Sequence, residues 1–424
     1  MYSHGMKKIV KILNISTSDL NGGAARAAYR IHKSLLEYDV NVEMLVQRKI
    51  SNDSSVHVQK GKTTKLISLI RPNLEKIPIQ LYKKRSTDIF STGLLPHNLL
   101  KEIMAIKPDL VHLHWVNSGF LSIKTISAIE QPIVWTLHDM WPFTGGCHYS
   151  DYCNKYKERC YECPKLGSKS NNDLSTYIFR KKIKLFNNKN ITIVTPSKWL
   201  QNCAQESMLF RNKNIIRIPY PIDLNIFKPL DTKIARELFN IPQNKKVVLF
   251  GALGSTKDPR KGYKYLKSAL NILEKSPGAD NLYFVVFGGQ NDSENEGHRN
   301  NIQYIDTLYD EYSLAMLYSA ADIFVAPSRE DNLPQTVLES LACGTPVVAF
   351  NIGGMPDMIE HKFTGFLAKP FSEHDISSGI LWLLSDNERL NEIKNNSRRK
   401  VCNEYSPNII ANEYINLYKQ VLCI

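Results

Sequence analysis

The sequence lacks any run of 18 consecutive apolar residues, which excludes a helix that spans a lipid bilayer. The apolar run within residues 1–16 is too short for a secretory signal peptide, so we expect a first β-strand there and a cytoplasmic protein. Cysteine is scarce, at eight in 424 residues, which excludes a small disulfide-held scaffold. Hydrophobic residues make up 43% and charged residues 22%, so we predict an ordinary globular chain of two or three domains.

Acidic residues are too few to balance the basic ones. The chain has 54 Lys and Arg against 41 Asp and Glu, a net charge of +13. This excess favours an anionic partner, such as nucleic acid, a phosphorylated ligand or an acidic lipid surface. The basic residues are not interleaved with stacking aromatics in any recognisable RNA-binding module, so we expect no nucleic acid partner.

Short apolar runs alternate with helical periods along the chain. The runs expected to form strands are 9–15, 110–114, 133–137, 191–195, 247–251, 283–288, 323–326 and 347–350. This alternation predicts parallel sheets covered by helices, and the proline-rich stretch 217–229 marks the best boundary. We predict an α/β protein with two Rossmann-like, doubly wound domains, 1–216 and 217–400, facing across a cleft. A helical stretch at 401–424 is expected to pack back on the first domain.

Polar residues that directly follow strands are the site candidates, because ligands of such folds bind at the carboxyl ends of strands. Gly22 and Gly23 follow the first strand and open a helix, which suits a phosphate, although a plain tight turn would use the same residues. His138 is expected to point into the cleft unless backbone groups satisfy it. His114 is a further candidate, whereas His112 is expected in the core.

The segment 326–339 leads from a strand through an acidic loop into a helix that begins near Pro334. Proline suits a first helical turn, and the amides of Gln335, Thr336 and Val337 are expected to remain free for an anion. Carboxylates at both ends of this turn suit the hydroxyls of a sugar and of a ribose.

Arg260 and Lys261 lie in the loop after the strand 247–251. Two adjacent cations suit a diphosphate, because arginine offers a planar fork of donors and lysine a point charge. A solvated surface loop is the alternative interpretation.

Together these residues resemble the family 4 retaining glycosyltransferases, which have the GT-B fold. The family signature is Glu, seven residues, Glu, then a helix and a strand. Asp331 and Glu339 have that spacing, and residues 342–348 (ACGTPVV) follow as in the family. The motifs at 353–357 and 364–367 also match. The resemblance is close over residues 245–370 and is to a bacterial subgroup that builds cell-surface polysaccharide.

The resemblance implies a role for each candidate. Lys261 and Arg260 would neutralise the leaving diphosphate, Asp331 would hold hydroxyls of the transferred sugar, and His138 would touch the sugar near the reacting carbon. Glu339 would bind the donor ribose. The other donor-binding residues would be Gly22, Gly23, Leu333, Pro334, Gln335 and Thr336. The enzyme would move a sugar, with retention of configuration, from a UDP- or GDP-linked donor to a glycan or a polyprenyl-diphosphate-linked acceptor.

Three departures from the family pattern stand out. The first acid is Asp331 rather than Glu, the linker at 219–223 reads Pro-Tyr-Pro-Ile-Asp, and residues 251–253 read Gly-Ala-Leu where the family has Gly-Arg-Leu. The arginine role therefore passes to Arg260. No Asp-x-Asp pair occurs, so we expect no catalytic cofactor. A helix N-terminus and two cations would stabilise the departing diphosphate in a front-face displacement.

Four cysteines crowd into a short insertion, 147–163: Cys147, Cys153, Cys160 and Cys163. The last two form a C-x2-C pair, and thiolates suit tetrahedral zinc. A structural zinc, free thiols and disulfides are the alternatives, with His148 as a substitute ligand.

The stretch Lys60–Arg85 carries eight Lys or Arg and one Glu, interleaved with Leu and Ile. It fits either a helix that lies on an anionic membrane surface or a helix pair with solvated lysines. A polyprenyl-linked acceptor favours the first, peripheral on the inner face of the plasma membrane. For the whole chain, the alternatives to a transferase are a GT-B sugar-nucleotide epimerase or hydrolase and a non-catalytic nucleotide-sugar binder.

Overall fold

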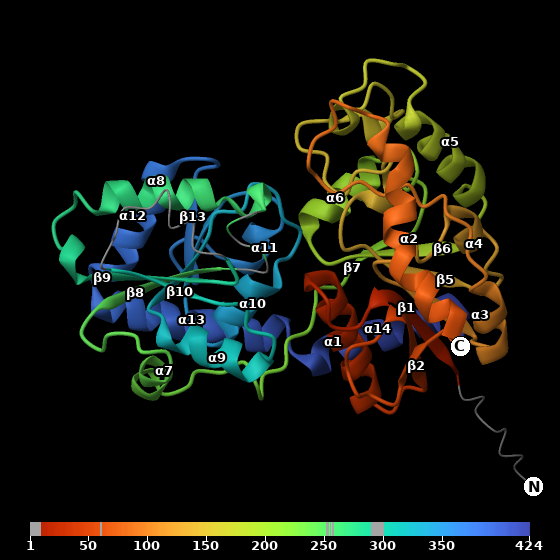
Figure 1. Ribbon diagram of the computed structural model, residues 1–424. Coiled ribbons are helices and arrows are strands. Elements are labelled where there is room, and N and C mark those ends of the chain that lie inside the picture. The colour runs from red at the N-terminus through yellow and green to blue at the C-terminus, as the bar shows by residue number, and fades with distance from the viewer. Residues whose placement is uncertain (1–9, 60–61, 252–253, 255, 257, 290–300) are drawn as a thin grey trace, which may run out of the picture. The chain divides into compact units, whose positions relative to one another are not determined.

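The computed structural model describes residues 10–59, 62–251, 254, 256, 258–289 and 301–424 (Figure 1). The chain divides into two compact units. Unit 1 comprises residues 1–219 and 410–424, and unit 2 comprises residues 220–409. The chain therefore leaves unit 1 within the proline-rich stretch and returns to it at residue 410, nine residues later than the predicted start of the final segment.

Unit 1 is built on a parallel sheet of seven strands in the order β3-β2-β1-β4-β5-β6-β7. The strands are β1 (Ile12–Ser18), β2 (Val42–Arg48), β3 (Val56–Val58), β4 (Leu110–Leu113), β5 (Ile133–Thr136), β6 (Ile191–Thr195) and β7 (Ile215–Arg217). The central strands are buried along their whole length because helices cover both faces, which explains their runs of Val, Ile and Leu. The strand order reverses between β1 and β4, where ligands of doubly wound sheets bind.

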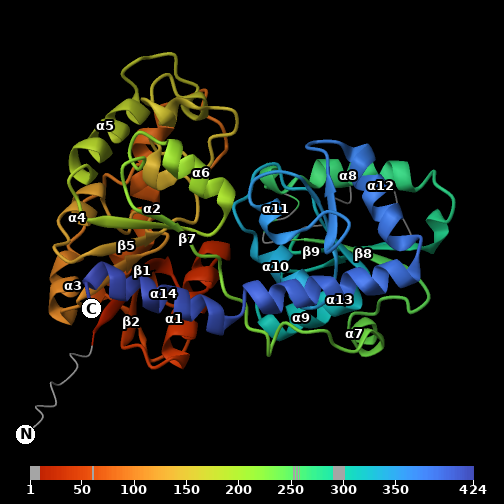
Figure 2. The same cartoon turned by 180° about the vertical axis from the view of Figure 1, so that it is seen from behind.

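Unit 1 also contains seven helices among the described residues. They are α1 (Gly23–Glu37), α2 (Lys62–Gln80), α3 (Leu100–Ile106), α4 (Ile123–Ser127), α5 (Leu174–Phe186), α6 (Lys198–Glu206) and α14 (Pro407–Leu422). Figure 2 shows α14 against the sheet of this unit. Its Tyr418 and Tyr414 form hydrogen bonds with His112 of β4 and Thr136 of β5, at 2.7 and 2.9 Å. Polar contacts thus join the C-terminal helix to the centre of the sheet.

Unit 2 is built on a parallel sheet of six strands in the order β10-β9-β8-β11-β12-β13. The strands are β8 (Lys246–Gly251), β9 (Leu282–Phe287), β10 (Ile302–Ile305), β11 (Ile323–Ala326), β12 (Val347–Phe350) and β13 (Gly365–Ala368). Its helices are α7 (Thr232–Leu238), α8 (Tyr263–Leu273), α9 (Glu311–Ala320), α10 (Gln335–Ala342), α11 (Met355–Met358), α12 (Glu373–Leu384) and α13 (Asn387–Glu404). The order reverses between β8 and β11, so loops 258–262 and 327–334 flank the expected ligand position.

The predicted strands are present, with shifts of a few residues. The first strand begins at Ile12 and runs to Ser18, whereas Ile9 lies outside the described residues, as do Ala252 and Leu253. The short or less apolar strands β2, β3, β7, β10 and β13 were not predicted. The expected helical stretch 401–424 comprises the end of α13 and the helix α14, because Pro407 has no N–H to continue α13 and instead begins α14.

Candidate active site

In unit 2, Lys261 and Asp331 form an ion pair at the carboxyl ends of β8 and β11. The Lys261 Nζ lies 2.7 Å from Asp331 Oδ2, and the two side chains are only 21% and 10% exposed. Asp331 also accepts hydrogen bonds from the Asn332 amide at 3.1 Å and the Ser328 hydroxyl at 3.5 Å. The structure therefore brings together two residues that the sequence assigns to the diphosphate and to the sugar. Both residues belong to unit 2.

Glycine makes the close approach of these loops possible. Gly262 has a φ of +73°, and a Cβ there would lie 1.8 Å from the Pro327 carbonyl oxygen. Gly353 has a φ of +53°, and its Cβ would lie 2.1 Å from the Asp331 carbonyl oxygen. The Arg329 amide donates to the Arg260 carbonyl at 2.7 Å. Three loops are thus held backbone to backbone around the Lys261–Asp331 pair.

The helix α10 begins beside this pair. Pro334 is the N-cap of this helix and so lies one position before the first helical turn, in which it was expected. Its side chain makes no capping hydrogen bond to the first amides. The Val337 amide donates to the Pro334 carbonyl at 3.2 Å, so the expectation that this amide is available to an anion is wrong. The Thr336 amide has no hydrogen-bond acceptor within the described part of the chain, which leaves it for a ligand.

A small cavity of unit 2 opens at the same place. Its wall is formed by Phe250, Gly251, Lys261, Phe324, Val325, Ala326, Ser328, Pro334 and Thr336. One side is apolar and comes from the ends of β8 and β11, whereas the other carries a cation, a hydroxyl and a helix start. The cation, the hydroxyl and the helix start on the polar side suit an anionic group.

Glu339 lies one turn into α10 and is 1% exposed. The Tyr318 hydroxyl donates to its Oε2 at 3.1 Å, which fixes the carboxylate. Leu333, at 3% exposed, precedes the helix in the same turn. The structure therefore groups Leu333, Pro334, Thr336 and Glu339 on one short segment.

Arg260 is directed elsewhere. Its Nη2 pairs with Asp258 Oδ2 at 2.7 Å, and the two side chains are 21% and 28% exposed. Arg329, which the sequence reasoning did not select, reaches the same loops through its backbone, and its buried Nε has no hydrogen-bond partner among the described residues. Its position in the loop directly after β11 was the sequence signal for it.

In unit 1, His138 lies just after β5 and beside His114, which follows β4. The His114 Nδ1 is 3.3 Å from the His138 Nε2, and the two residues are 2% and 8% exposed. His112 is fully buried, as expected, and bonds through Nε2 to Thr136 Oγ1 at 2.7 Å. Burial lowers the pKa of His138 to about 4, against a smaller opposing effect of Asp139, and lowers that of His112 to about 3. Both rings are neutral at pH 7.

Acid is expected to destabilise the protein through these histidines. Their pKa values are lower in the folded chain than the ordinary 6.5, so the unfolded chain binds more protons as pH falls from 6.5 towards 4. Stability is therefore lost over that window, by about 1 kcal/mol per pH unit for each histidine. Denaturation at pH 7 and pH 5 measures the loss. His112→Gln should reduce it, and the same change at the exposed His374 should not.

Asp139, the residue after His138, organises the loop around it. The Trp115 Nε1 donates to its Oδ2 at 2.9 Å, the Trp141 amide to its Oδ1 at 2.9 Å, and His148 Nδ1 lies 2.6 Å from Oδ2. Burial alone would raise the pKa of Asp139, but His148 and these donors bring it below its usual range. His148 Nε2 also contacts Ser91 Oγ at 2.9 Å, so both ring nitrogens are engaged by protein groups, and its use as a substitute metal ligand stays a prediction.

Gly22 and Gly23 lie between β1 and α1, as predicted. Gly22 is the N-cap of α1 with a φ of +92°, a conformation that favours glycine, and no atom lies within 4 Å of a Cβ built there. Backbone at this turn is therefore open to a ligand.

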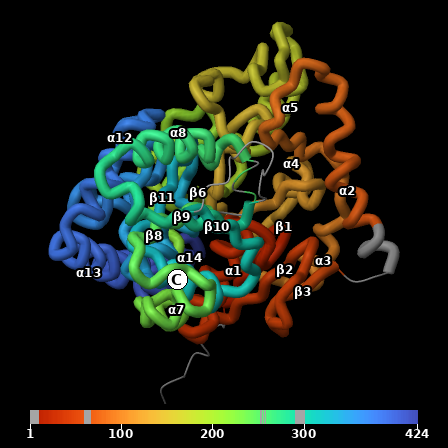
Figure 3. Tube along the Cα trace, turned by 60° about the vertical axis from the view of Figure 1, so that its left-hand side comes forward, coloured from red at the N-terminus to blue at the C-terminus, as the bar shows by residue number. Residues whose placement is uncertain are grey.

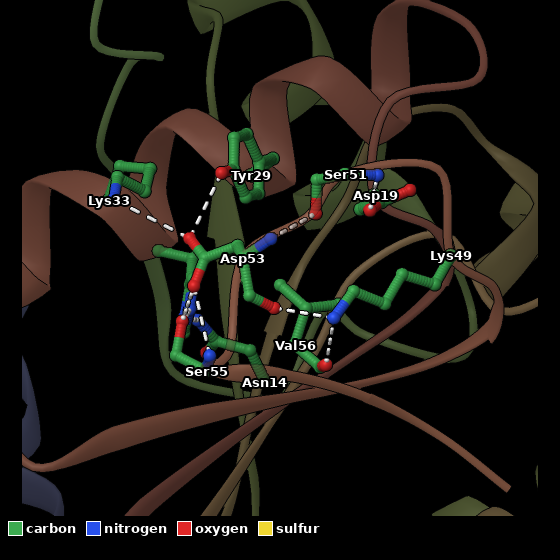
Figure 4. Close-up of polar contacts among 10 residues, drawn as sticks. Asn14, Asp19, Tyr29, Lys33, Lys49, Ser51, Asp53, Ser55 and Val56 are labelled. Carbon is green, nitrogen blue, oxygen red and sulfur yellow. Dashed lines mark hydrogen bonds and ion pairs between the residues drawn. The ribbon is translucent and has the colours of Figure 1, made fainter.

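Two aspartates that the sequence reasoning missed hold the surroundings of this turn. Asp19 is fully buried and accepts the amides of Ile50 and Ser51, at 2.9 and 2.8 Å, which joins the loops after β1 and β2. Asp53 accepts hydrogen bonds from Tyr29 of α1 and from the amide and hydroxyl of Ser55 (Figure 4). These contacts fix α1, whose first turn carries Gly23. An aspartate directly after a strand is the signal that could have identified Asp19.

The four insertion cysteines are all free thiols in the structure. Cys160 and Cys163 are 8% exposed, and Cys147 and Cys153 are half-buried. Burial raises the pKa of the Cys147, Cys160 and Cys163 thiols. Throughout the part of the chain that the structure describes, no group of three or more His, Cys, Asp or Glu residues is placed to hold a metal ion. Zinc thus stays a prediction, which metal analysis of the purified protein tests.

Comparisons with known proteins agree with this arrangement. The model "Glycosyltransferase Family 4" matches residues 21–226, and "Glycosyl transferases group 1" matches residues 231–400. An uncharacterized glycosyltransferase of Methanocaldococcus jannaschii is 29% identical over 332 residues, 74% of this chain and 75% of that protein. The N,N'-diacetylbacillosaminyl-diphospho-undecaprenol alpha-1,3-N-acetylgalactosaminyltransferase of Campylobacter jejuni is 30% identical over 168 residues, 38% of this chain and 42% of that protein.

Among solved structures, Anabaena HepE in complex with UDP and glucose has a TM-score of 0.65 at 17% identity, and the match covers 97% of this chain and 99% of that one. At this identity the likeness establishes the fold. The predicted GT-B architecture of two Rossmann-like domains is therefore confirmed by the two parallel sheets and by this neighbour.

Proposed function

We propose that this chain, which belongs to the family 4 glycosyltransferases, moves a sugar from a nucleotide diphosphate sugar to a glycan or lipid-linked acceptor. The reaction retains configuration and needs no metal. We place it in the synthesis of a bacterial surface polysaccharide, O-antigen, capsule or exopolysaccharide, at the cytoplasmic side of the membrane.

The Lys261–Asp331 pair beside the start of α10 is the observation that carries this proposal. The ammonium group is compensated by a carboxylate, at an Nζ–Oδ2 distance of 2.7 Å. A donor diphosphate would bring negative charge to that ammonium, while Asp331 would turn to hydroxyls of the transferred sugar. The Thr336 amide would add a donor from the helix N-terminus. Charge on the departing diphosphate would thus be stabilised by protein groups alone.

Glu339 fits the ribose of the donor. Its carboxylate is buried and is held by the Tyr318 hydroxyl, so it is positioned to accept hydrogen bonds from a diol. In unit 1, His138 is neutral at pH 7, so it would meet the sugar as a hydrogen-bonding group rather than as a cation. The second cation is assigned to Arg260, which would first have to leave Asp258.

Two relatives guide the choice of donor and acceptor. HepE binds UDP, and the Campylobacter enzyme acts on an undecaprenol diphosphate acceptor. We therefore propose a UDP-linked donor, with GDP as the alternative, and a polyprenyl-diphosphate-linked acceptor.

A thermal-shift panel of UDP, GDP, ADP and CMP tests the nucleotide site. A ligand at 100 times its dissociation constant stabilises the protein by about 2.7 kcal/mol, so we expect one uracil or guanine nucleotide to raise the melting temperature clearly. Glu339→Gln should remove the shift with little change in the melting temperature of the unliganded protein. No shift with any nucleotide would contradict the proposal. Release of free sugar from the donor without an acceptor would instead indicate a hydrolase.

A further inference from the structure

The helix α2 buries two charged side chains and exposes most of its described apolar ones. Its inward face is charged: Arg71 and Glu75 are 7% and 5% exposed. The Arg71 guanidinium donates to the carbonyls of Gly119 and Pro96, at 2.5 and 2.8 Å. Glu75 accepts the amides of Gly93 and Gly119, at 2.8 and 2.5 Å. Polar groups and the buried Ile79, which packs in the core of unit 1, thus attach the helix, and most of its described apolar side chains lie on the other face.

The outward face carries an apolar stripe. It consists of Ile67, Ile70, Leu74, Ile77 and Leu81, which are 46%, 49%, 41%, 52% and 79% exposed. Their spacing of three and four residues places them on one side of a helix. Figure 3 shows α2 at the outer side of unit 1. A continuous exposed stripe of Leu and Ile on a monomer marks an interaction surface rather than a solvated face.

The charges around the stripe are all of one sign. Lys76, Lys83, Lys84 and Arg85 are exposed, and the single acid between residues 67 and 85, Glu75, is buried. A second copy of the chain, related by a two-fold axis, would place these cations against the same cations. An anionic lipid surface can instead bind both, because its acyl chains contact the apolar stripe and its phosphates contact the cations. Within the described residues, no helix is long and apolar enough to cross a bilayer.

We propose that the outward face of α2 and the turn after it bind an anionic phospholipid surface. The stripe enters the boundary between headgroups and acyl chains, and Lys76, Lys83, Lys84 and Arg85 contact lipid phosphates. This binding uses none of the residues assigned to the nucleotide, so it holds or fails independently of the proposed transferase activity.

Vesicle sedimentation of the full chain tests the proposal. We expect binding to vesicles of phosphatidylcholine and phosphatidylglycerol at low salt, and at least tenfold weaker binding to phosphatidylcholine alone or at high salt. The triple variant Ile70→Ser, Leu74→Ser, Ile77→Ser and the double variant Lys83→Glu, Lys84→Glu should each bind at least tenfold more weakly. Matched changes on α7, Ile234→Ser and Leu238→Ser, alter residues that are 58% and 59% exposed and should leave binding unchanged.

Three outcomes would overturn it. The protein could remain in the supernatant with anionic vesicles at low salt, or the stripe variant could bind as well as the original chain. Sedimentation velocity could also show a dimer that the stripe variant dissociates, which would assign the face to a second copy. Thermal denaturation of each variant checks that it is folded.

Discussion

Lys261→Ala is expected to lower the rate of sugar transfer by about 10²–10³-fold, the range found when one group that stabilises transition-state charge is removed. The change also leaves the buried Asp331 without its cation. The site then presents a net negative charge to an anionic donor, so nucleotide affinity should fall as well as the catalytic rate. Nucleotide release in the presence of acceptor, and calorimetric titration with UDP or GDP, measure the two effects separately.

Two further variants separate charge from packing. Asp331→Asn keeps the shape of the carboxylate and frees the ammonium group, so it should retain nucleotide affinity while losing transfer. Lys275→Ala removes an exposed lysine of the same unit and should change neither quantity. If Lys261→Ala transferred sugar at the original rate, the assignment of this pair to the donor site would be wrong.

The sequence indicates each candidate residue of unit 2 separately, from its position after a strand. The fold explains why residues chosen in this way lie close together. Lys261 and Asp331 each follow a buried strand, and neighbouring parallel strands end at the same edge of a sheet, so both must lie near that edge. Their direct pairing was not predictable. It depends on contacts between loops more than 60 residues apart, such as the Arg329 amide on the Arg260 carbonyl, which no local pattern encodes.

Other features that the sequence did not predict have the same origin. The position of His148 beside Cys147 suggested only a substitute metal ligand, whereas the structure shows Asp139 and Ser91 in contact with its two ring nitrogens. The Val337 amide was expected to be free by counting from the start of the helix, but the extended backbone of Pro334, with ψ of 127°, brings its carbonyl to that amide. In each case a backbone angle or a distant partner decided the outcome, and neither is visible in residue types.

Gly262→Ala is expected to destabilise the protein more than any other glycine substitution with the same backbone angle. The φ of +73° alone costs an alanine about 1–2 kcal/mol, and a Cβ placed 1.8 Å from the Pro327 carbonyl oxygen adds about 1–3 kcal/mol for the displacement of one loop. That displacement would also separate Lys261 from Asp331, so nucleotide binding should be lost in the fraction that remains folded.

Gly278 offers the matched control. Its φ is +82°, but no atom lies within 4 Å of a Cβ built there. Gly278→Ala should therefore lower the free energy of unfolding only by the cost of this backbone angle, about 1–2 kcal/mol. Chemical denaturation and nucleotide titration of both variants separate the cost of the backbone angle from the cost of the steric clash with Pro327. Equal losses of stability in the two variants would mean that the loop after β11 moves away from Gly262 without cost, and the backbone contact would then not be what holds Lys261 beside Asp331.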